Sequence, residues 1–344
     1  MTRKLRFALN PDSSPTYANL AHYLMKQTWS RTRFEFLANF SETNFQFDFA
    51  AAEQLEFKDL LAQLVQKYCP HTVPRTYCIN ETNWPSLLNQ VADAQYPTSD
   101  KIGDLVWILK PAQLNNGHHI KIFESLSQIE AHFLSPNRLG GDHVLQEYIT
   151  HPHLLKGPKE GHKYSIRMFL ILTNYAGAYL YPHGYFNVAL QPYAHKDFTQ
   201  LNAHLTNEHL SDEQVNVIQI PTQQIVVFKT FYTQIKYILD AVIMGLNQLH
   251  HEAFVCKKTR KLAIFGFDFM VDVNEKVWLI EANHGPCFPT TAEHPLFSTL
   301  YHSFWQAFIK SFVFPIAEKT PVEKIRYHLF EPVSTKPCTD TQQG

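Results

Sequence analysis

One stretch near the end of the chain constrains the fold more than any other. Residues 265–272 and 277–283 are rich in aromatic and β-branched side chains, and the residues between them supply turn chemistry. These features predict a β-hairpin with Asn274 and Glu275 at its tip. The pairs that face each other in this register are Asp272 with Val277, Met270 with Leu279, and Asp268 with Glu281.

Period-two alternation places three oxygen-bearing side chains, Asp268, Glu281 and Asn283, on one face of this hairpin. The Cβ atoms of two directly opposed acids would lie about 5 Å apart, where like charges repel. Hard oxygen donors of this kind suit Mg²⁺ that bridges the phosphates of a nucleotide. A half-exposed hairpin edge with incidental acids is the alternative. We therefore predict a magnesium site formed by these three residues.

Composition limits the classes of protein to which the chain belongs. Its 344 residues predict two domains or three compact lobes, and its net charge of -1 argues against binding dominated by nucleic-acid phosphates. No run of 18 uncharged apolar residues exists, so no membrane span is expected. The five scattered cysteines lack metal-ligand spacing and predict a cytoplasmic protein. The paired histidines come without a cysteine, so a zinc site is disfavoured.

Helical and strand patterns alternate along the chain, which predicts an α+β or mixed α/β fold. Helices are predicted over residues 57–68, from 83, from 125 to 134, 224–250 and 296–316, the last stopped by Pro315. Strands are predicted over residues 105–110, 144–149, 164–173 and 178–182. Residues 151–163 read as a mobile loop, and residues 184–224 read as irregular and polar.

Several polar residues stand at the ends or in the middle of predicted strands. Lys110 ends a buried strand and suits a phosphate oxygen, although an exposed strand-end lysine is the common alternative. Gln146, Tyr148 and Ile149 offer polar and apolar groups that suit an adenine ring. Arg167 lies among apolar residues, where a charge requires a partner. We favour a bound anion over a structural ion pair for it.

Eight segments, in this order, resemble the tubulin tyrosine ligase-like family of ATP-grasp ligases. They are residues 74–77, 107–111, 144–148, 163–167, 178–181, 204–207, 265–270 and 278–286. The resemblance implies an α+β fold in which two lobes clasp ATP after a small leading lobe. The implied divisions are an N-terminal lobe at 1–73, a central ATP-grasp lobe at 74–144, a C-terminal ATP-grasp lobe at 145–318 and a polar tail at 319–344.

The resemblance also implies roles for individual residues. Lys110 and Arg167 would act on the phosphates and the reacting carboxylate, with Glu281 as the third catalytic residue. The implied ATP-binding residues are Arg75, Lys110, Gln146, Tyr148, Ile149, Lys163 and Asn207, and the implied Mg²⁺ ligands are Asp268, Glu281 and Asn283. The chain departs from the family where Ser165 replaces an aspartate and Asn187 replaces a second arginine. Its glycine-rich loop is reduced to Gly117 followed by two histidines.

The function that the resemblance implies is an ATP- and Mg²⁺-dependent ligase. It would join a free amino acid to a carboxylate of a protein or peptide through an acyl phosphate. We expect a monomer that binds neither nucleic acid nor membrane, and an acceptor that is not necessarily tubulin, since the chain is nearly neutral. The alternatives are a catalytically repurposed or inactive ATP-binding module and a plain protein-interaction domain.

Overall fold

The computed structural model describes residues 4–95, 105–115, 117–157, 159–195, 197–208 and 215–334. Its largest sheet is built from the β-prone residues after position 161. Its seven strands run in the order β11-β10-β8-β12-β13, with β9 beside β8 and β14 beside β9. All neighbours in it are antiparallel. The strands are β8 (His162–Thr173), β9 (Gly177–Leu180), β10 (Tyr185–Pro192), β11 (Val217–Pro221), β12 (Leu262–Val271), β13 (Val277–His284) and β14 (Glu331–Ser334).

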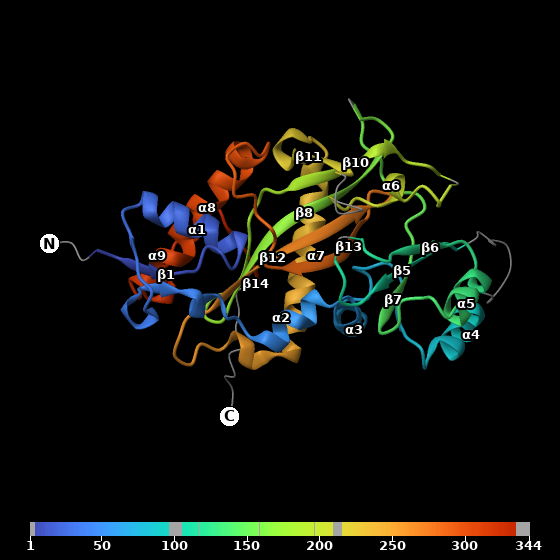
Figure 1. Cartoon of the computed structure of the whole chain (residues 1–344), viewed down its shortest axis with the longest axis horizontal. Helices are drawn as coiled ribbons and strands as arrows, with labels where there is room; N and C mark the ends of the chain where they lie inside the picture. The colour runs from blue at the N-terminus through green and yellow to red at the C-terminus, as the bar shows by residue number, and fades with distance from the viewer. Residues whose placement is uncertain are drawn as a thin grey trace.

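One face of this sheet is covered by helices from both ends of the chain. Ile166 and Met168 of β8 lie in a core with α7 (Phe228–Leu249), α2 (Phe49–Glu56) and α3 (Lys58–Tyr68). Figure 1 shows α7 crossing the sheet. The helices predicted over 57–68 and 224–250 are therefore confirmed as α3 and α7, and both bury the apolar stripe from which they were predicted.

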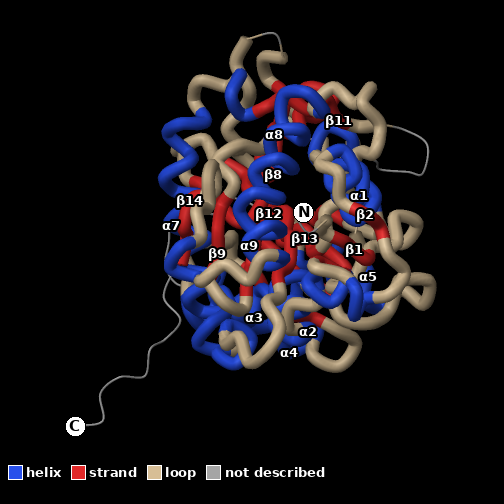
Figure 2. Tube along the Cα trace, turned by 90° about the vertical axis from the view of Figure 1, so that its left-hand side faces the viewer, coloured by secondary structure: helices blue, strands red, loops and turns tan. Residues whose placement is uncertain are grey.

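The opposite face of the sheet is only half covered. Phe169 of β8 lies in a second core with α1 (Pro15–Lys26), α8 (His302–Phe308) and α9 (Phe314–Ala317). In Figure 2, α8 and α9 lie in front of β12. The other half of this face, which begins at Lys163, lines a pocket instead.

The helix predicted over 296–316 is present, but Pro315 does not stop it. Segments Phe297–Tyr301 and Ile309–Val313 are π-helical, and α9 continues to Ala317. Pro315 lies in the first turn of α9, the part of a helix that best tolerates a residue without an N–H.

Two smaller sheets complete the molecule. A four-stranded sheet has the order β4-β7-β5-β6, and a three-stranded parallel sheet has the order β2-β1-β3. Figure 1 places these two sheets on opposite sides of the largest one. Their elements are β1 (Arg6–Ala8), β2 (Ser30–Arg31), β3 (Phe40–Ser41), β4 (Thr76–Ile79), α4 (Trp84–Gln95), β5 (Trp107–Pro111), β6 (Lys121–Phe123), α5 (Leu126–Leu134) and β7 (His143–Glu147).

The structure corrects several expectations about segments. The described part of residues 184–224 is not irregular throughout, because it contains β10, α6 (Leu201–His204) and β11. The expected mobile loop at 151–163 is held to the hairpin, since His153 N donates to the Val271 carbonyl at 2.9 Å. Within the described residues, no helix is both long and apolar enough to span a bilayer.

The predicted divisions also differ from the observed layers. Residues 1–73 do not form one lobe, because β1 to β3 build their own sheet while α2 and α3 join the core of the largest one. The boundary at 144 falls within β7. The polar tail expected from 319 contributes β14, and Phe330 is 4% exposed in the second core.

Candidate active site

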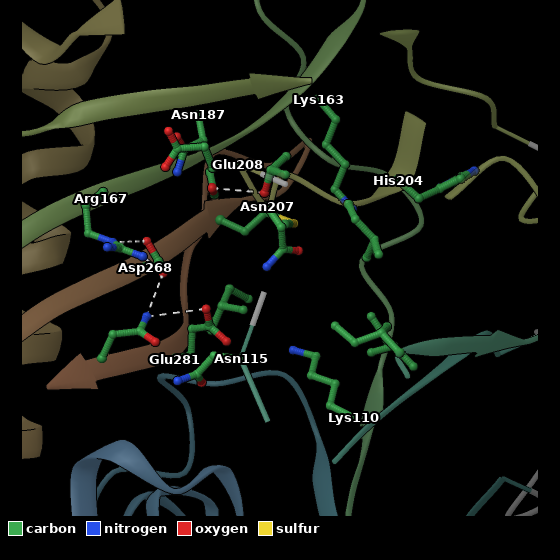
Figure 3. Close-up of a pocket in the computed structure, with 18 of the residues that line it drawn as sticks. Lys110, Asn115, Lys163, Arg167, Asn187, His204, Asn207, Glu208, Asp268 and Glu281 are labelled. Atoms are coloured by element: carbon green, nitrogen blue, oxygen red, sulfur yellow. Dashed lines mark hydrogen bonds and ion pairs between the residues drawn. The ribbon is translucent and has the colours of Figure 1, made fainter. Parts of the chain in front are cut away.

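A cavity of about 320 Å³ lies between the four-stranded and the seven-stranded sheets. Strands from both sheets contribute polar side chains to it (Figure 3). The predicted site residues that line it are Lys110, Gln146, Tyr148, Ile149, Lys163, Arg167, Asn207, Asp268, Glu281 and Asn283. The structure thus brings together residues that are far apart in the sequence, since Lys110 and Asn283 are separated by 173 positions.

The hairpin β12–β13 places Asp268 directly opposite Glu281, as predicted. The pairing nearer the turn differs, because Val277 faces Val271 rather than Asp272, and Leu279 faces Phe269 rather than Met270. A β-bulge between the two regions absorbs this shift of one residue, so the acids still share a face.

The three predicted metal ligands lie within hydrogen-bond distance of one another. Asn283 Nδ2 donates to Asp268 Oδ2 at 3.2 Å and to Glu281 Oε1 at 3.4 Å. A positively polarised amide group thus offsets the repulsion of the two acids, and a hard cation suits the same set of oxygen atoms. Among the described residues, no group of three or more His, Cys, Asp or Glu side chains forms a candidate metal site. The predicted set has only two acids.

Arg167 forms an ion pair, which was the alternative to the anion site that we favoured. Its Nε and Nη2 atoms donate to the two carboxylate oxygens of Asp268, each at 2.6 Å. Gly266 leaves room for this arrangement, because a Cβ atom there would lie 2.9 Å from Arg167 Cδ. Within the described residues, Nη1 makes no hydrogen bond and is the part of the guanidinium left for a ligand.

Lys110 and Gln146 form a buried hydrogen-bond chain. Lys110 Nζ donates to Gln146 Oε1 at 2.9 Å, and Gln146 Nε2 donates to Thr76 Oγ1 at 2.8 Å. Gln146 therefore orients Lys110, and its predicted contact with an adenine ring stays a prediction, because the residue also lines the cavity. Burial lowers the pKa of Lys110 to about 8, although the charge of Glu281 opposes this shift.

Lys163, Tyr148 and His204 form a second buried chain. His204 Nε2 lies 2.9 Å from the Asp197 carbonyl and must donate to it, which leaves Nδ1 to accept from the Tyr148 hydroxyl at 2.7 Å. The Tyr148 oxygen then accepts from Lys163 Nζ at 2.8 Å. Burial, followed by the charge of Lys110, lowers the pKa of Lys163 to about 7.

Arg75 was predicted to bind ATP, but its side chain does not line the pocket. Its Nε lies 3.5 Å from Glu147 Oε2, both side chains are partly exposed, and Arg75 is absent from the described lining. Among the residues of the reduced glycine loop, Asn115 lines the cavity, while Asn116 lies outside the described residues.

Sequence reasoning missed Lys58, at the start of α3. Its Nζ lies 3.7 Å from Glu281 Oε2 and donates to the Leu114 carbonyl at 2.8 Å. Burial raises the pKa of Glu281, but the charges of Lys58, Lys110 and Arg167 outweigh this effect and lower the pKa to about 2. A lysine buried at 8% exposure is unusual, but only the fold shows that Lys58 lies beside the acids.

Parts of this sequence are shared with known proteins. The sequence profile of the tubulin-tyrosine ligase family matches residues 46–321. The chain belongs to this family. Membership and the observed layers confirm the predicted α+β, ATP-grasp-like fold.

Individual family members share about a quarter of their aligned residues with the chain. Tubulin glycylase 3C of Tetrahymena thermophila is 27% identical over 215 residues, which are 56% of this chain and 19% of the relative. Tubulin polyglutamylase TTLL6 of Mus musculus is 25% identical over 268 residues, 69% of this chain and 30% of the relative. The inactive polyglycylase TTLL10 of Homo sapiens is 26% identical over 222 residues, 55% of this chain and 32% of the relative. The aligned part is thus about a third or less of each relative's length.

Proposed function

We propose that the chain is an ATP- and Mg²⁺-dependent ligase that joins a free amino acid to a carboxylate of a protein or peptide. The observation that carries this proposal is the convergence of Asp268, Glu281, Lys110 and Arg167 on one cavity, with Lys58 paired to Glu281. Acids and cations together suit a triphosphate with its metal ion better than either kind alone. The named relatives are glycylases and polyglutamylases, which supports a ligase that adds amino acids to proteins.

The chain's own residues would perform most of this work by position and charge. Lys58 and Lys110 would face the phosphates, because both lie near enough to Glu281 for their charges to lower its pKa. Arg167 would hold the reacting carboxylate through Nη1. Asp268, Glu281 and Asn283 would hold Mg²⁺, which offsets phosphate charge when bound.

The proposed reaction has two balanced steps. The γ-phosphoryl group of ATP passes to the acceptor carboxylate, which gives ADP and an acyl phosphate. The amine then forms an N–C bond as the C–O bond to phosphate breaks. Phosphate leaves with the electron pair and takes up the proton that the amine nitrogen loses. The position of the cavity between two sheets would limit the water that could otherwise hydrolyse the acyl phosphate.

Substitution of Glu281 by Gln tests the proposal. Glu281→Gln should abolish ATP turnover while circular dichroism shows an intact fold, because the amide keeps the shape but removes a charged ligand. Purified protein is incubated with Mg·ATP, labelled amino acids and cell lysate, and additions are located by mass spectrometry. Glu275→Gln, at the exposed tip of the same hairpin, is the matched control. Full turnover by Glu281→Gln would refute the metal assignment.

A second candidate is an ATP-binding module without ligase activity. The bidentate pair between Arg167 and Asp268 favours it, since this pair engages a metal ligand and the arginine at once. A relative that is named inactive supports the same possibility. Stabilisation by Mg·ATP without turnover across a broad panel of acceptors would select this candidate.

We also propose a cytoplasmic monomer. The five scattered cysteines of the sequence support a location in the cytoplasm. Cell fractionation and light scattering test the two statements separately.

A further inference from the structure

Asn187 and Glu208 line the side of the cavity across from Lys110, near the ion pair of Arg167 with Asp268 (Figure 3). Asn187 of β10 lies between Ser165 of β8 and Gln219 of β11 in the strand register. Gln219 Nε2 donates to Asn187 Oδ1 at 3.2 Å, and Asn187 is 6% exposed. Among the described residues, Asn187 Nδ2 has no hydrogen-bond acceptor, so it can donate one hydrogen bond to a ligand.

Glu208 gives this side of the cavity a negative charge. It lines the cavity, and its carboxylate forms no ion pair within the described residues. Burial raises the pKa of Tyr185, the charge of Arg167 lowers it, and the charges of Asp268 and Glu208 raise it, which places Glu208 near this part of β10. Figure 3 shows Asn187, Glu208 and Arg167 on one side of the cavity, with Lys110 across from them.

The lysines and the arginine that line the described cavity are engaged elsewhere. Lys110 and Lys163 are bound in the two hydrogen-bond chains, and Arg167 is paired with Asp268. His204 is held between the Asp197 carbonyl and the Tyr148 hydroxyl, and His284 Nδ1 lies 4.0 Å from Glu56 Oε2. Arg167 keeps Nη1 free, but the proposed function assigns that atom to the reacting carboxylate, so no described cation of the lining remains for a further carboxylate beside Asn187.

We propose that this side of the cavity binds the amine donor and selects an amino acid whose side chain carries no negative charge. This proposal rests on the proposed ligase function. Glu208 would accept from the donor's ammonium group before it loses its proton, and Asn187 Nδ2 would donate to the donor's single carboxylate. Glutamate brings a second carboxylate, which would face Glu208 without a cation, and such like-charge contacts are strongly unfavourable. Glu208 and Asn187 are thus specificity-determining residues.

A donor competition tests this assignment. The protein receives Mg·ATP, acceptor lysate and equal concentrations of isotopically labelled glycine, lysine and glutamate. Mass spectrometry should show glycine or lysine incorporated at least about tenfold over glutamate, which corresponds to about 1.4 kcal/mol. Preference for glutamate would overturn the inference while leaving the ligase function intact. Absence of incorporation with every donor would instead refute the proposed function.

Two variants assign the selectivity to residues. Glu208→Gln removes the exposed charge with little risk to folding, and it should improve glutamate use relative to glycine about fivefold to tenfold. Asn187→Arg should improve glutamate use further by supplying a cation. Glu293→Gln, an exposed acid outside the lining, is the matched control and should leave the ratio unchanged. An unchanged ratio in Glu208→Gln would remove Glu208 from the assignment.

Binding gives a readout that does not need turnover. With Mg²⁺ and a non-hydrolysable ATP analogue, glycine or lysine should raise the melting temperature more than glutamate does. Glu208→Gln should reduce this difference. Stronger stabilisation by glutamate would contradict the inference even if the chain proved catalytically inactive.

Discussion

Two buried lysines make the cavity sensitive to pH. The pKa of Lys163 in the folded protein is about 7, below its ordinary value of 10.5, because burial disfavours the charged form. The folded protein therefore releases this proton earlier than the unfolded chain does. Between these two values the unfolded state holds more protons, so the free energy of unfolding rises with pH and falls again as pH returns to 7.

We expect Lys163→Met to remove this pH dependence. The wild type should gain stability on the order of 4 kcal/mol relative to Lys163→Met between pH 7 and 10.5, at about 1.4 kcal/mol per pKa unit. Urea denaturation at intervals of one pH unit measures the difference, in which all other titrating groups cancel. Lys67→Met changes an exposed lysine of α3 and should retain the wild-type slope. Parallel curves for wild type and Lys163→Met would contradict the buried charge.

Lys58 is expected to act on phosphate contacts through its charge beside Glu281. Lys58→Met should lower kcat/KM for ATP about tenfold to a hundredfold, the usual effect of removing one charged hydrogen bond. Steady-state kinetics with the acceptor at saturation measure this ratio. Lys67→Met, at the other end of the same helix, serves as the control. Equal kinetics in both variants would make Lys58 a structural residue.

Residue roles were predictable where short-range pattern suffices. The shared face of Asp268, Glu281 and Asn283 follows from alternation along two adjacent strands, so the sequence predicts their meeting. Lys58 enters the site from 223 positions before Glu281, and no local pattern reports such a contact. The hydrogen bond from Lys110 to Gln146 was likewise not predictable, because the two residues meet only across the sheet.

At the scale of elements, hidden strands explain most of the errors. β10 and β11 carry Asn187 and Gln219 toward the cavity, and these polar side chains interrupt the apolar pattern by which strands are predicted. A strand face that lines a cavity for a charged ligand carries polar side chains, so it lacks the apolar alternation by which strands are predicted. The bulge in β12–β13 was equally invisible, because an extra residue changes the register without changing composition.

Substitution of Phe330 tests whether the residues from 319 onward contribute to the second core. Phe330→Ala should destabilise the protein by about 3–5 kcal/mol, since this buried ring contacts Tyr181, Phe304 and Phe312. Phe36→Ala removes a phenylalanine that is 83% exposed, and it should change stability by less than about 0.5 kcal/mol. Thermal denaturation compares the two variants. Similar melting temperatures would show that β14 adds little to the core.

At the scale of the whole molecule, the cavity joins two separate sheets, so a nucleotide should stabilise both. Mg·ATP at a hundred times its Kd should add about 2.7 kcal/mol to the free energy of unfolding. Differential scanning fluorimetry should therefore show a rise of a few degrees that chelation of Mg²⁺ reduces. No shift at any nucleotide concentration would instead favour a plain protein-interaction domain.

The position of α3 has a consequence for dividing this protein into modules. A boundary near residue 73 looks natural in the sequence, yet a cut there would remove both a layer of the main core and the lysine that neighbours the hairpin acids. A shortened protein that begins after α3 would lose a residue of the candidate site and part of its core together. Trimming must therefore spare the stretch from α2 onward, and Phe7 of β1 and Phe40 of β3 argue against removing the preceding residues, because both are buried in the second core.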